Sequence, residues 1–259
     1  MKKLLINGCS FTAGTGFEGE KENPKIWPNL LHKEYFSNYE LTNIAEPARN
    51  NEWIFHTTVS ALIKNHYDNV IVAWTAIPRY NVPIGLELYT TWSQLWENKR
   101  VIGTHEHGEL SAEFLSDLGN NLRRLHNDHW DILKLVQYVN LLVEIQEKRN
   151  GKICFVNSLC PWSRNFFKYN KSITVKELSN FEKNMFNADS RSDTEVIELY
   201  NMVHRQYDDN GGIHANKWVN LYKSLLRLRI DQIKDEDFHP GHKSQYVFVK
   251  EIKKYHENI

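Results

Sequence analysis

The sequence has few cysteines and no excess of charge of either sign. Its 259 residues include three cysteines, an odd and sparse set that argues against a disulfide framework and fits a reducing compartment. The 32 basic and 32 acidic residues cancel, so no overall field favours nucleic acid or an anionic membrane. We therefore expect a soluble, cytoplasmic protein that binds neither nucleic acid nor a membrane.

Long apolar segments are missing too. Near the N-terminus the apolar core covers only residues 4–6, whereas a signal peptide needs about 7 to 15 apolar residues. No later segment approaches the roughly 18 uninterrupted apolar residues of a membrane-spanning helix. The glycines after the first apolar run are not followed by the Gly-Lys-Ser/Thr of a phosphate-binding loop. We accordingly predict no membrane segment and no cofactor.

What is present is a regular alternation of strand and helix patterns. Residues 4–6 and 70–74 are apolar runs typical of buried strands, and we also predict strands over 39–45 and 153–159. The segments with helical spacing of apolar residues are 27–36, 52–64, 129–148 and 243–254. Asn50 or Asn51 is a suitable N-cap for the second of these helices. Strands that alternate with helices at this spacing predict a parallel sheet with right-handed crossovers.

Two regions depart from this alternation. Residues 80–127 mix aromatic and polar side chains, and we interpret them as an insertion over the sheet's edge with room for a short hairpin. Residues 161–230 have a mainly helical and irregular pattern. We predict a single domain over residues 1–259 that includes both regions. In the first of them, His105 and His107 have no third ligand at a recognisable spacing, so we predict no metal site.

Candidate chemistry lies at the two ends of the chain. The first apolar run breaks at Gly8, which places Ser10 in a tight turn at the edge of a sheet where α/β proteins bind ligands. A serine nucleophile needs an adjacent base, and the base needs a third group to orient it. His239 follows an acidic cluster and could be that base. Taken singly, however, Ser10 fits an ordinary turn residue and His239 fits a surface or capping residue.

Three short blocks resemble the SGNH (GDSL-type) hydrolase family. The sequence Gly8-Cys9-Ser10-Phe11-Thr12 is similar to the family's first block, a strand followed by Gly-Asp-Ser-Phe/Leu. Asn43 is similar to the asparagine of the second block, with Ala48 in place of the glycine five residues later. The sequence Asp237-Phe238-His239-Pro240 is similar to the last block, an acid shortly before His-Pro. The resemblance covers both ends of the chain and leaves residues 80–230 almost unconstrained.

This resemblance implies a fold and a catalytic triad. The fold would be a three-layer α/β/α domain with a flavodoxin-like, mostly parallel five-stranded sheet. Ser10 would be the nucleophile and His239 its base. Asp237 would orient the histidine, with Glu236 as the alternative acid because many family members carry the acid three residues before the histidine.

The oxyanion hole that the resemblance implies is incomplete. The backbone N–H groups of Ser10 and Ala48 would form part of it. The family's third block, Gly-x-Asn-Asp after the third strand, is replaced here by Trp74-Thr75-Ala76-Ile77-Pro78-Arg79, so the usual asparagine is missing. The candidates to replace it are Thr75, Arg79 and Asn81. Arg79 is equally suited to a structural ion pair.

The implied activity is that of a serine esterase acting on small esters through an acyl-enzyme intermediate. The aromatic residues of the 80–127 insertion favour a carbohydrate ester, such as an O-acetylated sugar. Two alternatives stay open: transfer of the acyl group to a sugar hydroxyl, and a non-catalytic binding or assembly protein on the same fold. The missing asparagine motivates the second alternative. The sequence leaves the oligomeric state open.

Overall fold

A computed structural model of the chain describes most, but not all, of its residues. The described residues are 1–76, 79–84, 87–92, 128–159, 175–177, 183, 188–204, 214–220, 223–234 and 239–256. The chain divides into two compact units, the first made of Met1–Pro161 with Lys217–Ile259 and the second of Trp162–Asn216. A single domain over residues 1–259 stays a prediction.

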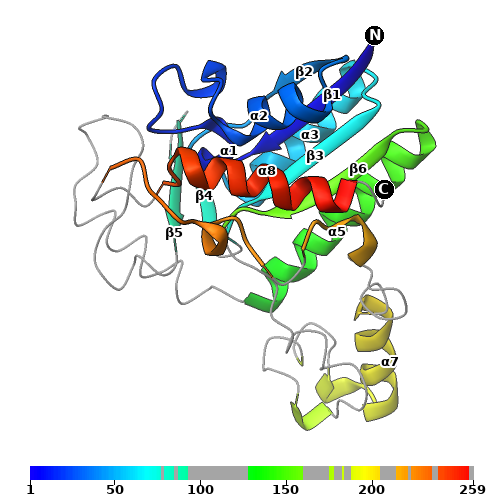
Figure 1. The fold of residues 1–259 in the computed structure, drawn as a ribbon. Helices are drawn as coiled ribbons and strands as arrows, with labels where there is room; N and C mark the ends of the chain where they lie inside the picture. The colour runs from blue at the N-terminus through cyan, green and yellow to red at the C-terminus, as the bar shows by residue number, and fades with distance from the viewer. Residues whose placement is uncertain are drawn as a thin grey trace. The chain divides into compact units, whose positions relative to one another are not determined.

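A parallel sheet is the centre of the first unit (Figure 1). Its described strands are β1 (Lys2–Gly8), β2 (Tyr39–Asn43), β3 (Asn69–Trp74) and β6 (Lys152–Asn157). Their order is β2-β1-β3-β6, and every neighbouring pair is parallel. This order is the one that a flavodoxin-like sheet has over its first four strands. The predicted parallel α/β sheet is confirmed, whereas a fifth strand in it is not found within the described ranges.

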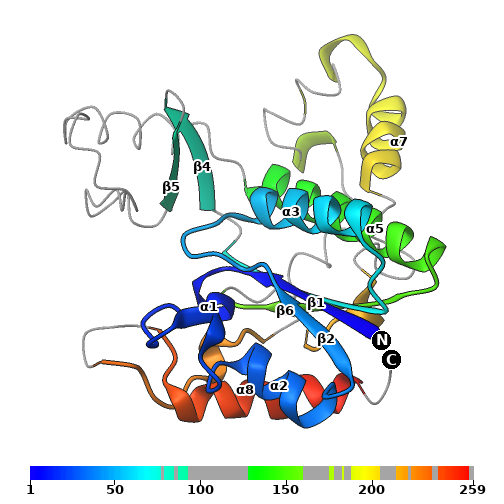
Figure 2. The same ribbon diagram turned by 90° about the horizontal axis from the view of Figure 1, so that it is seen from above.

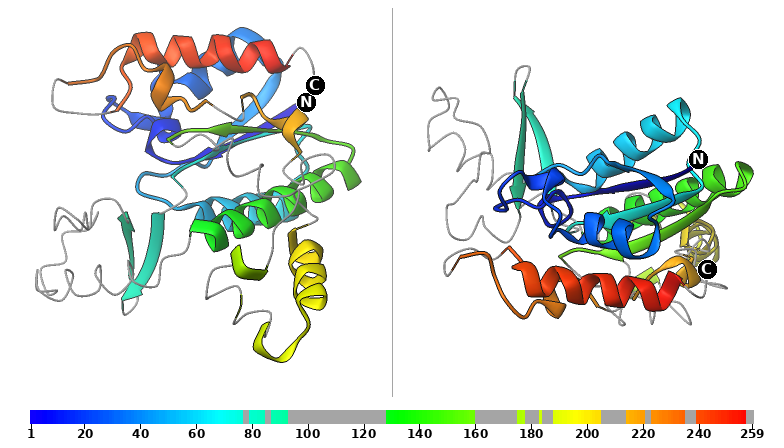
Figure 3. Two further views of the ribbon diagram at one scale, coloured as in Figure 1. Left: turned by 90° about the horizontal axis from the view of Figure 1, so that it is seen from below. Right: turned by 45° about the horizontal axis from the view of Figure 1, so that its top comes forward.

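Helices cover both faces of this sheet. Helices α2 (Trp27–Tyr35) and α8 (His242–His256) lie on one face, and α3 (Asn51–Lys64) and α5 (Asp128–Lys148) lie on the other (Figures 2 and 3). The arrangement is the predicted three-layer α/β/α architecture. Burial on both faces explains why β3 contains the continuous apolar run from Val70 to Trp74.

The helices begin at the residues that their sequences favour. Pro28 lies in the first turn of α2, where its missing N–H costs no hydrogen bond. Asn50 is the N-cap of α3, and its side chain accepts a hydrogen bond from the Trp53 N–H at 2.8 Å. The choice between Asn50 and Asn51 is thus settled in favour of Asn50. Asn51 instead accepts a hydrogen bond from the Thr75 N–H.

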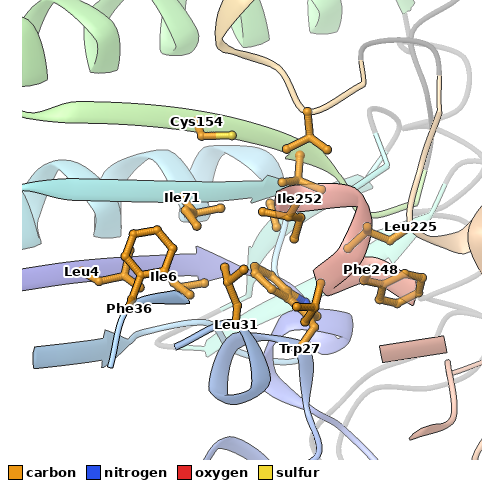
Figure 4. Packing of buried hydrophobic residues seen from close by; sticks show 14 residues of the cluster. Leu4, Ile6, Trp27, Leu31, Phe36, Ile71, Cys154, Leu225, Phe248 and Ile252 are labelled. Atoms are coloured by element: carbon orange, nitrogen blue, oxygen red, sulfur yellow. The ribbon is translucent and has the colours of Figure 1, made fainter. Parts of the chain in front are cut away.

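The core between the sheet and helices α2 and α8 is built from alternate residues of each strand. Leu4 and Ile6 of β1 contact this cluster, together with Ile71 of β3. Trp27 of α2 and Phe248 of α8 are completely buried against them (Figure 4). Each such side chain contributes about 1.5 to 3 kcal/mol when it leaves water, so this face holds the C-terminal helix firmly on the sheet.

A short hairpin and a capped helix lie outside the sheet and its covering helices. Strands β4 (Arg79–Ile84) and β5 (Glu87–Trp92) pair antiparallel, which is the short hairpin for which the 80–127 region had room. His105 and His107 lie outside the described residues. In the second unit, helix α7 (Asp193–His204) follows a capping box in which Ser192 N–H donates to Glu195 Oε2 at 2.8 Å.

Candidate active site

Ser10 lies in a tight turn at the carboxyl end of β1. It is the first residue of α1 (Ser10–Ala13), a single helical turn, and only 8 % of it is exposed. The N–H groups of Thr12 and Ala13 both donate to the Cys9 carbonyl at 2.9 Å. A Cβ at Gly8 would lie 2.3 Å from Thr12 Oγ1, so this turn, residues 8–13, requires glycine at its start. We call it the Ser10 turn.

The segment after β2 is attached to the Ser10 turn. Asn43 Nδ2 donates to the Thr12 carbonyl at 3.3 Å, and Asn43 Oδ1 accepts from the Ala45 N–H at 3.1 Å. The Glu46 N–H donates to the Gly8 carbonyl at 3.2 Å. These bonds place the second block of the family resemblance beside the first.

Ala48 has a left-handed backbone conformation. Its φ is +58°, a region that glycine adopts freely and that costs another residue about 1 to 2 kcal/mol. Ala48 stands where the family resemblance implies a glycine. The structure keeps the glycine-like conformation in spite of the added methyl group.

Arg49 and Asn51 hold the chain on either side of the start of α3. Arg49 donates from Nε and Nη2 to Glu46 Oε2 at 3.0 and 2.8 Å, and its guanidinium lies 4.9 Å from the Trp53 ring centroid. Asn51 Oδ1 accepts from the Thr75 N–H at 2.8 Å. Asn51 therefore joins the start of α3 to the segment that follows β3. From the sequence, Asn51 was a candidate only for the helix cap.

Arg79 is a buried cation beside Thr75. It is 7 % exposed, and Nη1 donates to Thr75 Oγ1 at 3.1 Å. Burial lowers the pKa of Arg79, the nearby Cys9 thiol acts in the opposite direction, and the Arg49 cation lowers the pKa further. Of the three candidates for the missing oxyanion donor, Thr75 and Arg79 are thus in contact, with the Thr75 N–H already bound to Asn51. The side chain of Asn81 lies outside what the structure describes.

His239 is brought to the Ser10 turn. Its ring contacts the Phe11 ring edge to face, with 5.6 Å between centroids and 60° between planes. Phe11 also packs with Cys9, with Ala76 after β3 and with Leu159 after β6 in a small apolar cluster. The segments that follow β1, β3 and β6 therefore meet His239 at one edge of the sheet.

The relation of Ser10 to the rest of the predicted triad is only partly described. The described contact is the one between the His239 ring and Phe11, the residue after Ser10. Asp237 and Glu236 lie outside the described residues, so the choice of acid stays a prediction.

Several polar residues that support this edge were not recognised from the sequence. Asn7 is completely buried, and its Nδ2 lies 2.9 Å from each of the Ile54 carbonyl and the Thr57 and Thr58 hydroxyls. Asn7 interrupts the apolar pattern of β1, which is a signal that could have identified it. Asp231 and Gln245 hold the chain around His239, and no sequence motif marks either of them.

Comparisons with known proteins give structural similarity only. No family model and no curated protein matches the sequence. In structure, the chain is similar to esterases and to lipases, among them a GDSL-like lipase. The psychrotrophic esterase EstA of Pseudoalteromonas sp. is 11 % identical with a TM-score of 0.46, over 100 % of this chain and 98 % of that chain. A carbohydrate acetylesterase family member of Sinorhizobium meliloti is 12 % identical with a TM-score of 0.45, over 100 % and 98 %. A GDSL-like lipase of Bacteroides thetaiotaomicron is 10 % identical with a TM-score of 0.38, over 100 % and 89 %.

Two further observations concern binding classes. Among the described residues, no three His, Cys, Asp or Glu side chains lie together in a way that could hold a metal ion. No helix within the described ranges combines the length and the apolar character that crossing a membrane requires.

Proposed function

We propose that this protein is a serine esterase of the SGNH type that hydrolyses small esters through an acyl-enzyme intermediate. The observation that carries the proposal is the contact between the His239 ring and Phe11, the residue next to Ser10. It brings together the two ends of the chain that resemble the family's first and last blocks. The burial of Ser10 at the carboxyl edge of the sheet supports the same assignment.

In the first half of the reaction the Ser10 oxygen attacks the ester carbonyl and His239 takes the hydroxyl proton. The tetrahedral intermediate then collapses, the bond to the leaving alcohol breaks, and His239 returns the proton to that alcohol. In the second half a water molecule gives its proton to His239 and attacks the acyl-Ser10 ester. The acid is released, Ser10 regains its proton, and Asp237, or Glu236 in its place, keeps the histidine in the productive tautomer.

The oxyanion of both intermediates would be held by the N–H groups of Ser10 and Ala48. The left-handed conformation of Ala48 supports this role, because it directs the N–H group as a glycine at the same position would. The third donor would be Arg79, Thr75 or Asn81. Arg79 has a buried guanidinium beside Thr75, which supports it as a donor that needs little reorganisation. A missing oxyanion donor costs about 3 to 4 kcal/mol of transition-state stabilisation.

The substrate we propose is an ester with a short acyl group, such as an O-acetylated carbohydrate. Hydrolysis of p-nitrophenyl acetate by the purified protein tests the reaction, with Ser10→Ala as the inactive variant. We expect Ser10→Ala to lower kcat by at least about a thousandfold, as loss of a nucleophile does in triad enzymes. Unchanged hydrolysis by Ser10→Ala would remove the catalytic assignment. A product analysis with a sugar acceptor separates hydrolysis from acyl transfer.

A non-catalytic binding protein is the second candidate, and the missing asparagine after β3 favours it. A fluorophosphonate probe distinguishes the two, because it reacts only with an activated serine. Labelling of Ser10, identified by mass spectrometry, is the result that the esterase requires. An unlabelled wild-type protein that nevertheless binds an acetylated sugar would support the second candidate.

A further inference from the structure

Helix α8 is capped by a carboxylate that lies well before its first turn in the sequence. Asp231 Oδ1 accepts from the Ser244 N–H at 2.7 Å, and Asp231 Oδ2 accepts from the Lys243 N–H at 2.9 Å. The residue directly before the helix, Gly241, has no side chain that could do this. Asp231 therefore satisfies two of the N–H groups that the start of a helix leaves without partners.

The Ser244 hydroxyl completes the connection in the opposite direction. It is completely buried, contacts the Asp231 carboxylate, and accepts from the N–H groups of Ile230 and Asp231 at 2.9 and 3.0 Å. Burial acts to raise the pKa of Asp231, but the hydrogen bonds from Ser244 and Lys243 outweigh it and hold this pKa below its ordinary value. The pair is thus an ionised carboxylate and a hydroxyl that bind each other's backbone.

Asp231 also contacts the chain that carries His239. The Gly241 N–H donates to the Asp231 carbonyl at 3.1 Å, and the Ile233 N–H donates to the His239 carbonyl at 3.2 Å. A Cβ at Gly241 would lie 2.7 Å from Asp231 Oδ2, so the close approach of these segments needs glycine. The backbone of His239 is therefore attached to residues 231–233, and Asp231 attaches those residues to α8.

We propose that Asp231 and Ser244 form a clamp that positions His239 to take the proton of Ser10. The inference rests on the proposed function, and it assigns Asp231 a role through His239, without contact to the reacting atoms. Helix α8 is held on the sheet by its buried face, so it is a rigid base for the clamp. With the clamp released, the backbone of His239 loses this base.

The test measures the kinetics of fluorophosphonate labelling in the full chain, for Asp231→Asn and Ser244→Ala. A displaced base slows the reaction of every folded molecule, whereas irreversible loss of the fold lowers the fraction of molecules that becomes labelled. We expect the rate constant of labelling to fall by about tenfold to a hundredfold, the range that a displacement of about 1 Å produces, with the final labelled fraction unchanged.

Asp68→Asn is the matched control. Asp68 Oδ2 accepts from the Lys3 N–H at 2.7 Å, so it too is a carboxylate bound to backbone. It precedes β3 and therefore lies at the amino end of the strands, whereas Ser10 lies at their carboxyl end. We expect Asp68→Asn to label at the wild-type rate. Equal rate constants for the wild type, Asp231→Asn and Ser244→Ala would overturn the clamp while leaving the esterase intact.

Hydrogen exchange tests the clamp without any use of catalysis. The amides of Ile233 and Gly241 are expected to exchange faster in Asp231→Asn than in the wild type, with the amides of β1 unchanged. Unaltered exchange at both positions would overturn the inference by itself. A wild-type protein that is not labelled at Ser10 would instead refute the proposed function, and with it the catalytic purpose of the clamp.

Discussion

The Ser10 turn and the chain around His239 are held in place by different kinds of contact. The Ser10 turn is closed by bonds between neighbours in sequence, since the N–H groups of Thr12 and Ala13 donate to Cys9, and Asn43 and Glu46 bind it from the segment after β2. The chain around His239 depends on Asp231 and on Gln245, whose Nε2 donates to the Pro240 carbonyl at 3.2 Å. The turn around the proposed nucleophile thus has its own local hydrogen bonds, whereas the chain around the proposed base is held by Asp231 and Gln245.

The largest effect is expected for Gly8→Ala, which disrupts the Ser10 turn. The added methyl group would meet Thr12 Oγ1 at 2.3 Å and the Ala73 Cβ at 3.0 Å, so the turn must move. We expect a loss of about 3 kcal/mol of unfolding free energy, as for overpacked cores, together with loss of Ser10 labelling. Urea denaturation measures the first effect. In Gly19→Ala the methyl group meets nothing within 4 Å and the positive φ of +73° adds a strain of only about 1 to 2 kcal/mol, so labelling is expected to persist, and its loss there would contradict the steric explanation.

Gln245→Ala breaks the long-range side. Gln245 Oε1 accepts from the Trp27 N–H at 2.9 Å, and both residues are buried, so the variant leaves a buried donor without its partner. We expect a loss of about 2 kcal/mol, within the range for such groups. Chemical denaturation gives the value, with the exposed Lys250→Ala on the same helix as the control. A loss no larger than that of the control would show that α8 is held by its apolar face alone.

The acid dependence of stability tests the His239 side of this comparison, because Asp231 lies on that side. Its pKa is lowered in the folded protein, so the stabilisation is complete above the unfolded pKa of about 3.9 and is lost as the pH falls through the folded pKa. We expect Asp231→Asn to have a shallower loss of stability than the wild type below about pH 4. Thermal melting between pH 2 and 7 measures it. Parallel melting curves for the two proteins would argue against the assigned cause.

The smallest effect is expected from Ala48→Gly, which relieves strain beside the Ser10 turn. Since φ of Ala48 is +58°, glycine removes a steric cost, and we expect a gain of about 1 kcal/mol in unfolding free energy. In Ala45→Gly, a buried neighbour without positive φ, we expect a loss of similar size. Differential scanning calorimetry resolves both signs. A loss in Ala48→Gly would mean that the methyl group contributes packing that outweighs the strain.

Much of the first unit was predictable because its elements follow from local patterns. The strand patterns predicted the positions of β1, β2, β3 and β6. The asparagine before α3 is the cap that its sequence favours. The predicted ends of strands were less accurate. The pattern placed the end of the second strand at Ala45, but the paired residues stop at Asn43, because Asn43 turns its side chain back to bind the Ala45 N–H.

The candidate site was predictable only as far as its motifs extend. Ser10 and His239 were identified through their neighbours in sequence, and the contact through Phe11 agrees with their pairing. Asp231 and Ser244 are thirteen residues apart and no local pattern marks either of them, so their bond appears only in the folded chain. The link between Asn51 and Thr75 likewise joins the start of α3 to the segment after β3, two regions that sequence periodicity treats independently.

The burial of Cys9 beside Ser10 provides a way to time the opening of this edge. The Cys9 thiol is free and completely inaccessible, and Cys154 is a second free thiol within β6, where burial raises its pKa to about 12. A thiol reagent can reach either sulfur only in molecules that have opened around it. The ratio of the two modification rates would therefore report how often the Ser10 turn opens by itself, relative to opening of the sheet.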